Sequence, residues 1–164
     1  MTIIEPAVDR ATTDTSATRA AVLEQLSEYW SSLPRLSAAA PETLAFPRAF
    51  LGDDYVVRFG DMPLEAEGDE MLAAIAAEND EKWVTHVEPC YVMVDVEQGR
   101  AAAHFHEKLV HPQSGGILRE MSYFSHMEFT FEDGRLKLRR EHLVEVPAKF
   151  RSDVRPGSGS EGGR

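Results

Sequence analysis

The chain has 164 residues and a formal net charge of −11 at pH 7. That length suits one domain with a core large enough to enclose a pocket. The acidity argues against nucleic acid and anionic membranes as partners, because both are bound through clustered Lys and Arg. Cys90 is the only cysteine, which excludes an intrachain disulfide. The sequence lacks a signal-peptide pattern and any apolar run of membrane-spanning length, so we expect a cytoplasmic protein.

The two ends of the chain differ in composition from its middle. Residues 1–15 are rich in Thr, Asp and Ala without hydrophobic periodicity, and RPGSGSEGGR at 155–164 is rich in Gly and Ser. We therefore expect a disordered N-terminus over 1–15, one folded domain over 16–150 and a flexible tail over 151–164.

A helix is predicted in the first part of that domain. Thr15 and Ser16 are its candidate N-caps, and Pro34 ends it because proline has no backbone N–H to donate. The apolar residues that recur at helical spacing are Val22, Leu23, Leu26, Tyr29, Trp30 and Leu33.

Two further helices are expected on either side of a strand. A short helix within 40–51 is broken at Pro47, and DYVVRFGDM at 54–62 has the composition of a strand. The segment 68–83 predicts a third helix with Asp69 as its cap.

After this helix the apolar pattern changes to a period of two residues. It predicts four strands, at about 83–97, 100–111, 117–131 and 135–146, joined by the turn sequences EQGR, PQSGG and EDGR. Helices followed by a meander of long antiparallel strands indicate an α+β fold, with the helices packed on one face of a curved sheet.

Four of the six histidines fall on the first two of these strands. A regular hairpin with its turn at Gln98–Gly99 places His86 directly opposite His111, with their Cβ atoms about 5 Å apart. Pro89 weakens this prediction, because a bulge at that point would turn His86 to the other face.

The face shared by the two histidines also carries Glu107 and Cys90, in a wall that is otherwise apolar. Polar groups on an apolar wall need partners, because unpartnered burial is costly. One interpretation is therefore a structural hydrogen-bonded cluster. The other is a ligand site in which Glu107 orients a histidine for acid–base chemistry.

The remaining residues of this hairpin argue against a metal centre. His104, His106 and Lys108 alternate onto the opposite face, where we interpret them as surface or dimer contacts. Opposite faces of a sheet cannot share an ion. A metal would have to use the two opposed histidines and their carboxylate, and we expect neither metal nor cofactor.

The order of elements resembles the SnoaL-like, nuclear transport factor 2-like (NTF2-like) superfamily. The resemblance covers about residues 17–146 and rests on the helices, the short strand ending in VVRFGD and the four long strands, with FTFEDGRLKLRREHL near the end. It implies a cone-like α+β barrel, with three N-terminal helices on a curved, mainly antiparallel sheet around an internal pocket. It also implies a homodimer formed through the sheet.

Within that superfamily, TH at 85–86 and VHPQ at 110–113 resemble scytalone dehydratase. Two pocket histidines of that enzyme help to eliminate water from a ketone without a cofactor. The resemblance implies this role for His86 and His111, and it makes Tyr29 a substrate-binding residue of the first helix.

The chain also departs from these relatives. Trp30 stands where the dehydratase has an aspartate, and the tyrosine of its first strand falls near Phe59 or Tyr55. Ketosteroid isomerases of the same fold have an aspartate base near position 59, so their base is missing here.

The last hairpin resembles phenazine-biosynthesis members of the superfamily. Their DGRIK…RE corresponds to DGRLKLRRE at 133–141, which makes Glu141 the counterpart of their pocket glutamate. A straight hairpin turns His142 rather than Glu141 toward Met127, and a bulge is needed to bring Glu141 inward.

We therefore expect a cofactor-independent enzyme that dehydrates, isomerises or cyclises a small, largely apolar molecule, in keeping with secondary-metabolite biosynthesis. The alternative is a non-catalytic binding or assembly protein of the same fold. The candidate catalytic residues are His86, His111, Glu107, Tyr123 and Glu141. The candidate substrate-binding residues are Tyr29, Tyr55, Phe59, Trp83, Cys90, Phe105, Met127 and His142.

Overall fold

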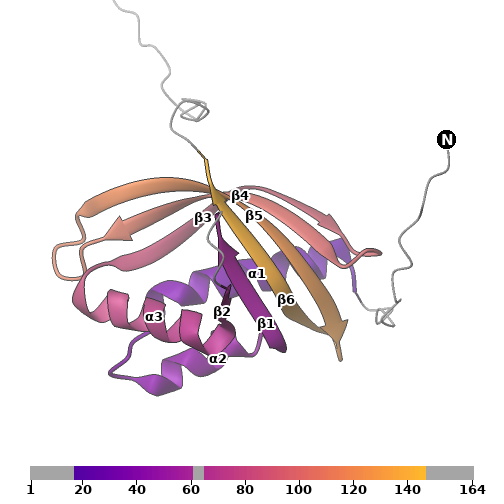
Figure 1. The fold of residues 1–164 in the computed structure, drawn as a ribbon, viewed down its shortest axis with the longest axis horizontal. Helices are drawn as coiled ribbons and strands as arrows, with labels where there is room; N and C mark the ends of the chain where they lie inside the picture. The colour runs from indigo at the N-terminus through magenta and orange to yellow at the C-terminus, as the bar shows by residue number, and fades with distance from the viewer. Residues whose placement is uncertain (1–16, 61–64, 147–164) are drawn as a thin grey trace, which may run out of the picture.

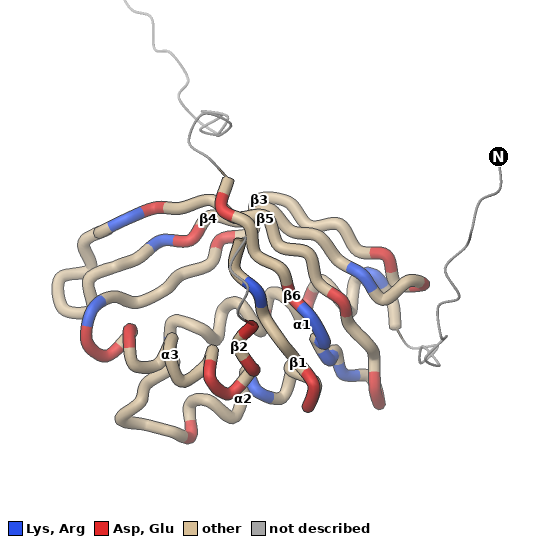
Figure 2. Tube along the Cα trace, viewed as in Figure 1, with Lys and Arg blue, Asp and Glu red and all other residues tan. Residues whose placement is uncertain are grey.

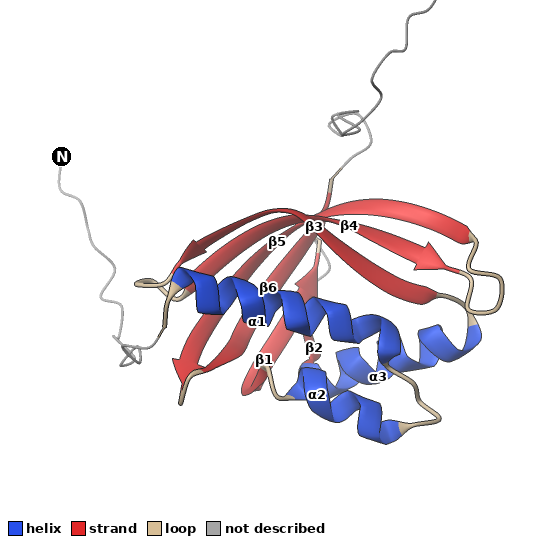
Figure 3. Cartoon of the chain, turned by 180° about the vertical axis from the view of Figure 1, so that it is seen from behind, coloured by secondary structure: helices blue, strands red, loops and turns tan. Residues whose placement is uncertain are grey.

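The computed structural model of the chain describes residues 17–60 and 65–146. In this part, three α-helices lie on one side of a six-stranded sheet that curves over them (Figure 1) (Figure 3). The predicted α+β architecture is confirmed. The ends predicted to be disordered or flexible, 1–15 and 151–164, lie outside the described residues, as do both margins of the predicted domain over 16–150.

Helix α1 (Arg19–Ser32) begins just after Thr18, whose side chain accepts a hydrogen bond from the Ala21 N–H at 3.1 Å. The helix therefore starts slightly later than predicted. At its other end, Pro34 lies in the 3₁₀ turn Leu33–Arg35, as expected for a residue that cannot continue the α-helical ladder. The side chains that α1 buries include Val22, Leu26, Tyr29 and Trp30.

Helix α2 (Ala45–Arg48) is a single short turn that follows the 3₁₀ turn Pro41–Leu44. Pro47 lies inside this short helix and is buried, so it does not break the element as predicted. A proline is tolerated there because the first turn of a helix leaves its backbone N–H groups without intrahelical partners.

Helix α3 (Gly68–Glu81) is capped by Glu67, and Asp69 lies in its first turn instead. Glu67 accepts from the backbone of Glu70, and the Glu70 side chain accepts from the Glu67 N–H at 3.1 Å. This reciprocal arrangement satisfies two N–H groups at the start of the helix. The prediction that Asp69 is the cap was wrong, because these two glutamates form the capping box.

The four predicted long strands are all present, and one short strand was not anticipated. The strands are β1 (Leu51–Phe59), β2 (Glu65–Glu67), β3 (Val84–Asp95), β4 (Arg100–Val110), β5 (Ile117–Glu132) and β6 (Arg135–Glu145). Their order in the sheet is β2-β1-β6-β5-β4-β3. The β1–β6 pair is parallel and the other pairs are antiparallel, so the first strand lies beside the last one in the sheet.

Two bulges decide which side chains face the helices. On β3, Pro89 pairs with Phe105 and Tyr91 with His104, which leaves Cys90 unpaired. On β6 the register shifts at Arg139. Because side chains alternate between faces, each extra residue exchanges the two faces for the rest of its strand.

The hydrophobic core lies between the helices and the concave face of the sheet. The opposite, convex face carries no helix (Figure 1). Its middle is uncharged, because charged residues on β3, β4 and β5 gather toward the strand ends (Figure 2). Among the described residues, no helix is long and apolar enough to span a membrane.

Candidate active site

A buried carboxyl group lies at the centre of the concave face. The bulge at Arg139 turns Glu141 inward, where its side chain is 5% exposed. The Tyr55 hydroxyl donates to Oε2 at 2.7 Å, and the Ser125 hydroxyl donates to Oε1 at 2.7 Å. Both carboxylate oxygens therefore have a neutral donor, and no cation of the described residues is bonded to either.

This cluster extends to helix α1. The hydroxyl of Tyr29 interacts with that of Tyr55, and both tyrosines are 2% exposed. Burial, reinforced by the nearby Glu141, raises the pKa of each phenol well above its usual value. The two tyrosines are therefore neutral hydrogen-bonding groups at any ordinary pH.

Burial is also the largest influence on the ionisation of the Glu141 carboxyl group. It raises the pKa of Glu141, although the hydrogen bonds from Ser125 and Tyr55 oppose the shift. Desolvation disfavours the charged form, and two neutral donors do not fully offset it. Glu141 therefore keeps its proton to a higher pH than an exposed glutamate does.

A second carboxyl group lies on the same face, nearer the end where β4 leads into the loop before β5. Glu107 is partly buried and pairs with Val87 on β3 and Met121 on β5. Within the described part of the chain, no group hydrogen-bonds its carboxyl oxygens. Burial raises the pKa of Glu107 to about 7, against a lowering by the Arg119 guanidinium.

Aromatic side chains separate the two carboxyl groups. The ring of Phe105 lies 5.7 Å from that of Tyr123 and 6.3 Å from that of Trp30, measured between centroids. Along β5, Met121 is level with Glu107, whereas Ser125 bonds Glu141. Four residues of strand correspond to about 13 Å, so the two carboxyl groups act at separate positions along one apolar wall.

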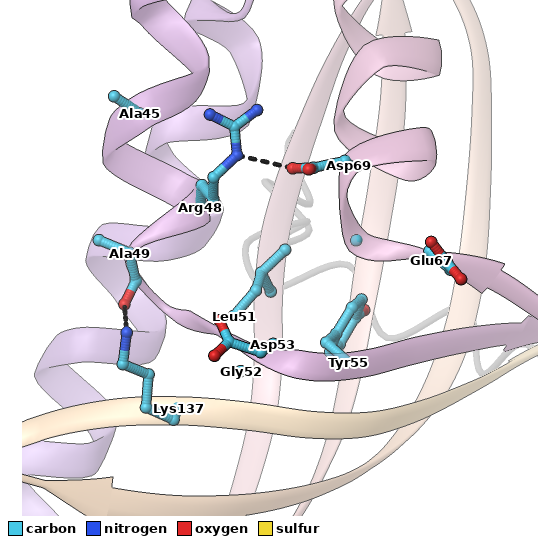
Figure 4. Close-up of a pocket in the computed structure, with 11 residues that line it drawn as sticks. Ala45, Arg48, Ala49, Leu51, Gly52, Asp53, Tyr55, Glu67, Asp69 and Lys137 are labelled. Carbon is cyan, nitrogen blue, oxygen red and sulfur yellow. Dashed lines mark hydrogen bonds and ion pairs between the residues drawn. The ribbon is translucent and has the colours of Figure 1, made fainter.

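A pocket of about 470 Å³ lies beside this network, between α2, the start of β1 and the start of α3 (Figure 4). Arg48 and Asp69 form an ion pair at 2.6 Å across it, and the Lys137 ammonium donates to the Ala49 carbonyl at 2.8 Å. Tyr55 belongs to both places, since its ring lines the pocket and its hydroxyl bonds Glu141.

The predicted pairing of His86 with His111 was wrong. The hairpin closes between Asp95 and Arg100 around a four-residue turn, and the unpaired Cys90 shifts the ladder by one more residue. His86 therefore lies opposite Lys108, on the convex face. That shift turned the side chain to the wrong face for a site with Glu107.

His111 lies beyond the end of β4, in the turn that leads to β5. Its Nδ1 accepts from the backbone N–H groups of Gln113 at 3.2 Å and Ser114 at 3.3 Å. These bonds make it a turn-stabilising residue in this structure. Glu107 therefore has no histidine to orient, which corrects that part of the prediction.

Three predicted wall residues also lie elsewhere. Cys90 is exposed in the β3 bulge, and Phe59 is 43% exposed at the end of β1. His142 points away from Met127, and its Nε2 lies 2.9 Å from the Gly60 carbonyl oxygen, because the bulge at Arg139 exchanged the faces. A straight-hairpin pattern gives the wrong face at all positions beyond a bulge.

The other predicted wall residues differ in burial. Phe105 and Met127 are buried on the concave face, and Tyr123 is partly buried with its hydroxyl 3.3 Å from the Met121 sulfur. Trp83 is partly buried at the junction of α3 and β3, with the Lys82 ammonium 5.6 Å from its ring. No three His, Cys, Asp or Glu side chains of the described ranges come together as a metal site would require.

Sequence reasoning missed one residue of this arrangement. Ser125 shares the face of Met127, but a lone serine gave no sign that it bonds a carboxylate from the next strand. Arg119 shares the same alternation, and its influence on Glu107 follows from the diagonal register of β4 and β5.

No protein-family model matches the chain, and no curated protein matches its sequence. Solved structures do match its fold. An NTF2-like protein from Cytophaga hutchinsonii superposes with a TM-score of 0.58 at 10% identity, over 79% of this chain and 99% of that one. The chain has the NTF2-like fold.

Two other structures with this fold indicate the kinds of protein that adopt it. ActVI-ORFA from Streptomyces coelicolor superposes with a TM-score of 0.56 at 18% identity, over 77% of this chain and 95% of that one. An LEH-like epoxide hydrolase from M. tuberculosis superposes with a TM-score of 0.53 at 12% identity, over 77% of this chain and 84% of that one. The NTF2-like fold therefore hosts enzymes, and identities this low show the fold alone.

Proposed function

We propose that the protein is a cofactor-independent enzyme that transfers a proton on a small, largely apolar molecule bound against the concave face. The observation that carries this proposal is Glu107, a partly buried carboxyl group without a hydrogen-bond partner in the described chain, whose pKa is raised to about 7. A general acid–base group is most effective when its pKa lies near the working pH.

Glu107 suits this role better than Glu141 or the two predicted histidines do. Glu141 is almost fully buried and already holds two donors, so its place is that of a fixed polar anchor. The two predicted histidines, His86 and His111, lie on the convex face and in a turn. We therefore assign proton transfer to Glu107, and the cluster of Glu141 and its tyrosines serves as a polar anchor within the fold.

The proposed chemistry follows from these positions. The Glu107 carboxylate takes a proton from a carbon activated by a neighbouring carbonyl group, while the Phe105 and Tyr123 rings hold the flat part of the molecule. Returning the proton to another carbon isomerises the substrate. Returning it to a departing hydroxyl group eliminates water.

The test uses 2-tetralone, a flat ketone with activated C–H bonds. In D₂O the wild-type protein should accelerate exchange of these hydrogens, followed by NMR, and Glu107→Gln should lower the enzymatic rate roughly 100-fold. Glu120→Gln removes an exposed carboxylate opposite Lys108 in the β4–β5 ladder and should leave the rate unchanged. The proposal would be refuted if the wild-type protein exchanged these hydrogens no faster than buffer does. It would also be refuted if Glu107→Gln and Glu120→Gln gave equal exchange rates.

We further propose that the protein is a homodimer formed through the convex face. Its exposed large apolar side chains include Tyr91 (55%), Met93 (50%), Phe124 (44%) and Val144 (40%). The ring of His104 stacks on Phe124 at 5.3 Å, and its Nε2 is buried without a partner among the described residues. A monomer rarely exposes such a continuous apolar patch.

The charge pattern of this face favours a second copy as the partner. Asp95, Arg100, Glu128 and Arg140 form one row across four strands, so charges alternate in sign and suit a two-fold copy of themselves. Four strands of roughly ten residues present about 600 Å² per copy. Two copies reach about 1,200 Å², the lower end for a stable interface.

A further inference from the structure

Two charged side chains stand on the concave face of β4 and β5, and they lie together. The register pairs Glu107 with Met121 and Leu109 with Arg119, so Glu107 and Arg119 are diagonal neighbours. Diagonal neighbours have backbones about 7–8 Å apart, within reach of long side chains. The other inward residues of these strands are Ala101, Ala103, Phe105, Leu109, Met121, Tyr123, Ser125, Met127, Phe129 and Phe131.

Arg119 is only loosely held in this structure. Its Nη2 lies 3.8 Å from Oε1 of Glu145, and the two side chains are 61% and 47% exposed. An exposed ion pair at that distance contributes little stability, so a better-placed anion can displace it. The guanidinium is therefore a cation beside the proposed proton-transfer group that a ligand can reach.

We propose that Arg119 binds a carboxylate group of the substrate, which makes the substrate a small, largely apolar monocarboxylic acid. A guanidinium presents two parallel N–H groups that match the two oxygens of a carboxylate. Glu107 and Glu145 disfavour a dianion such as phosphate beside the same arginine. The Phe105 and Tyr123 rings receive the apolar remainder. This inference rests on the proposed function.

Binding at Arg119 should also change the protonation of Glu107. An anion on the guanidinium cancels the effect that lowers the pKa of Glu107 and adds a like charge beside it. The other charged or titratable groups on its side of β4 and β5 are Arg119 and Tyr123, and its β3 neighbour is Val87. The buried side chains of α3 are the uncharged Met71, Leu72, Ala76 and Asn79, and its partly buried Glu78 forms an ion pair with Lys82. Binding of the acid should therefore raise the pKa of Glu107, which makes its carboxylate a stronger base for the bound substrate.

The probes are 2-naphthoate and its neutral counterpart 2-naphthamide, with binding followed by fluorescence. Arg119→Met should weaken naphthoate binding at least roughly tenfold, the effect of losing a charge-assisted contact, and change naphthamide binding less than about twofold. Arg19→Met removes one exposed positive charge at the start of α1 and should leave both affinities unchanged. Thermal unfolding of each variant checks that the fold is intact.

The pH dependence provides a second readout. Wild-type affinity for naphthoate should fall as the pH rises through about 7, because Glu107 loses its proton and repels the anion. In Glu107→Gln the affinity should be independent of pH over the same range. The assignment would be overturned if Arg119→Met lost affinity for naphthoate and naphthamide equally. It would also be overturned if the wild-type affinity for naphthoate did not depend on pH.

Failure of this inference is distinguishable from failure of the proposed function. Proton exchange of neutral 2-tetralone does not need Arg119, so it should persist in Arg119→Met if Glu107 transfers protons. If exchange persists and naphthoate shows no preference for Arg119, the carboxylate site is wrong and the enzyme proposal stands. If exchange is absent from the wild type, the enzyme proposal fails.

Discussion

The hydroxyl of Tyr55 on β1 donates to Oε2 of Glu141 on β6 at 2.7 Å, with both side chains buried. These two residues lie far apart in the sequence, and the parallel β1–β6 pairing brings their strands together. The bond joins the proposed polar anchor to the wall of the pocket beside α2, because Tyr55 lines that pocket. Removal of this hydrogen bond should therefore change both the pKa of Glu141 and the stability of the protein.

We expect Tyr55→Phe to destabilise the protein by about 1–3 kcal/mol, because Glu141 loses a donor in a buried site. The same loss should raise the pKa of Glu141 further, since that bond lowers it. Urea unfolding measures the first effect, and ¹³C NMR titration of the glutamate carboxyl groups measures the second. Tyr91→Phe, at an exposed tyrosine, is the control. An unshifted Glu141 would show that the bond is not formed in solution.

Stability should fall as the pH rises above the ordinary glutamate range. The pKa values of Glu107 and Glu141 are raised in the folded state, so the folded protein holds these protons more tightly than the unfolded chain does. For Glu107 this contribution is complete below about 4.5 and is lost as the pH rises through about 7. Chemical denaturation across this range should show a shallower fall in Glu107→Gln. An equal slope in both proteins would contradict the raised pKa.

Gly99→Ala should destabilise the β3–β4 hairpin. Gly99 has a φ of +62°, and an added Cβ would lie 2.5 Å from the Phe129 carbonyl oxygen of β5. Gly115→Ala is the matched control, since its φ is +71° and nothing lies within 4 Å of the added Cβ. We expect a loss of about 1–3 kcal/mol for strained backbone at Gly99. Thermal unfolding should show a larger loss of stability for Gly99→Ala than for Gly115→Ala. Equal losses would show that the contact between the added Cβ and the Phe129 carbonyl oxygen has no effect.

Phe124→Asp should convert the proposed homodimer to a monomer. A carboxylate at the uncharged centre of the convex face would face its own copy across the two-fold axis of the proposed dimer, and like charges there repel. Light scattering after size exclusion gives the mass. Phe46→Asp, on exposed α2, should leave the mass unchanged. A wild-type protein that is monomeric at high concentration would refute the dimer.

Much of the fold was determined by local patterns in the sequence. The alternation of apolar residues after position 83 and the turn glycines gave the long strands within a few residues. Pro34 marked the end of α1 correctly. These features depend on neighbouring residues along the chain, which is why a single sequence contains them. The short β2 was missed, because three residues of strand carry too little pattern.

The candidate site depended on contacts between distant residues. The bulge at the unpaired Cys90 moved His86 to the convex face, and local alternation does not encode that shift. The bulge at Arg139 brought Glu141 inward, where Arg139 pairs with Asp54 of β1 and Glu141 meets Tyr55 of the same strand.

The sequence by itself determined the elements and the α+β class. Only the tertiary structure decided which face each side chain occupies, because one extra residue in a ladder exchanges the faces at little local cost.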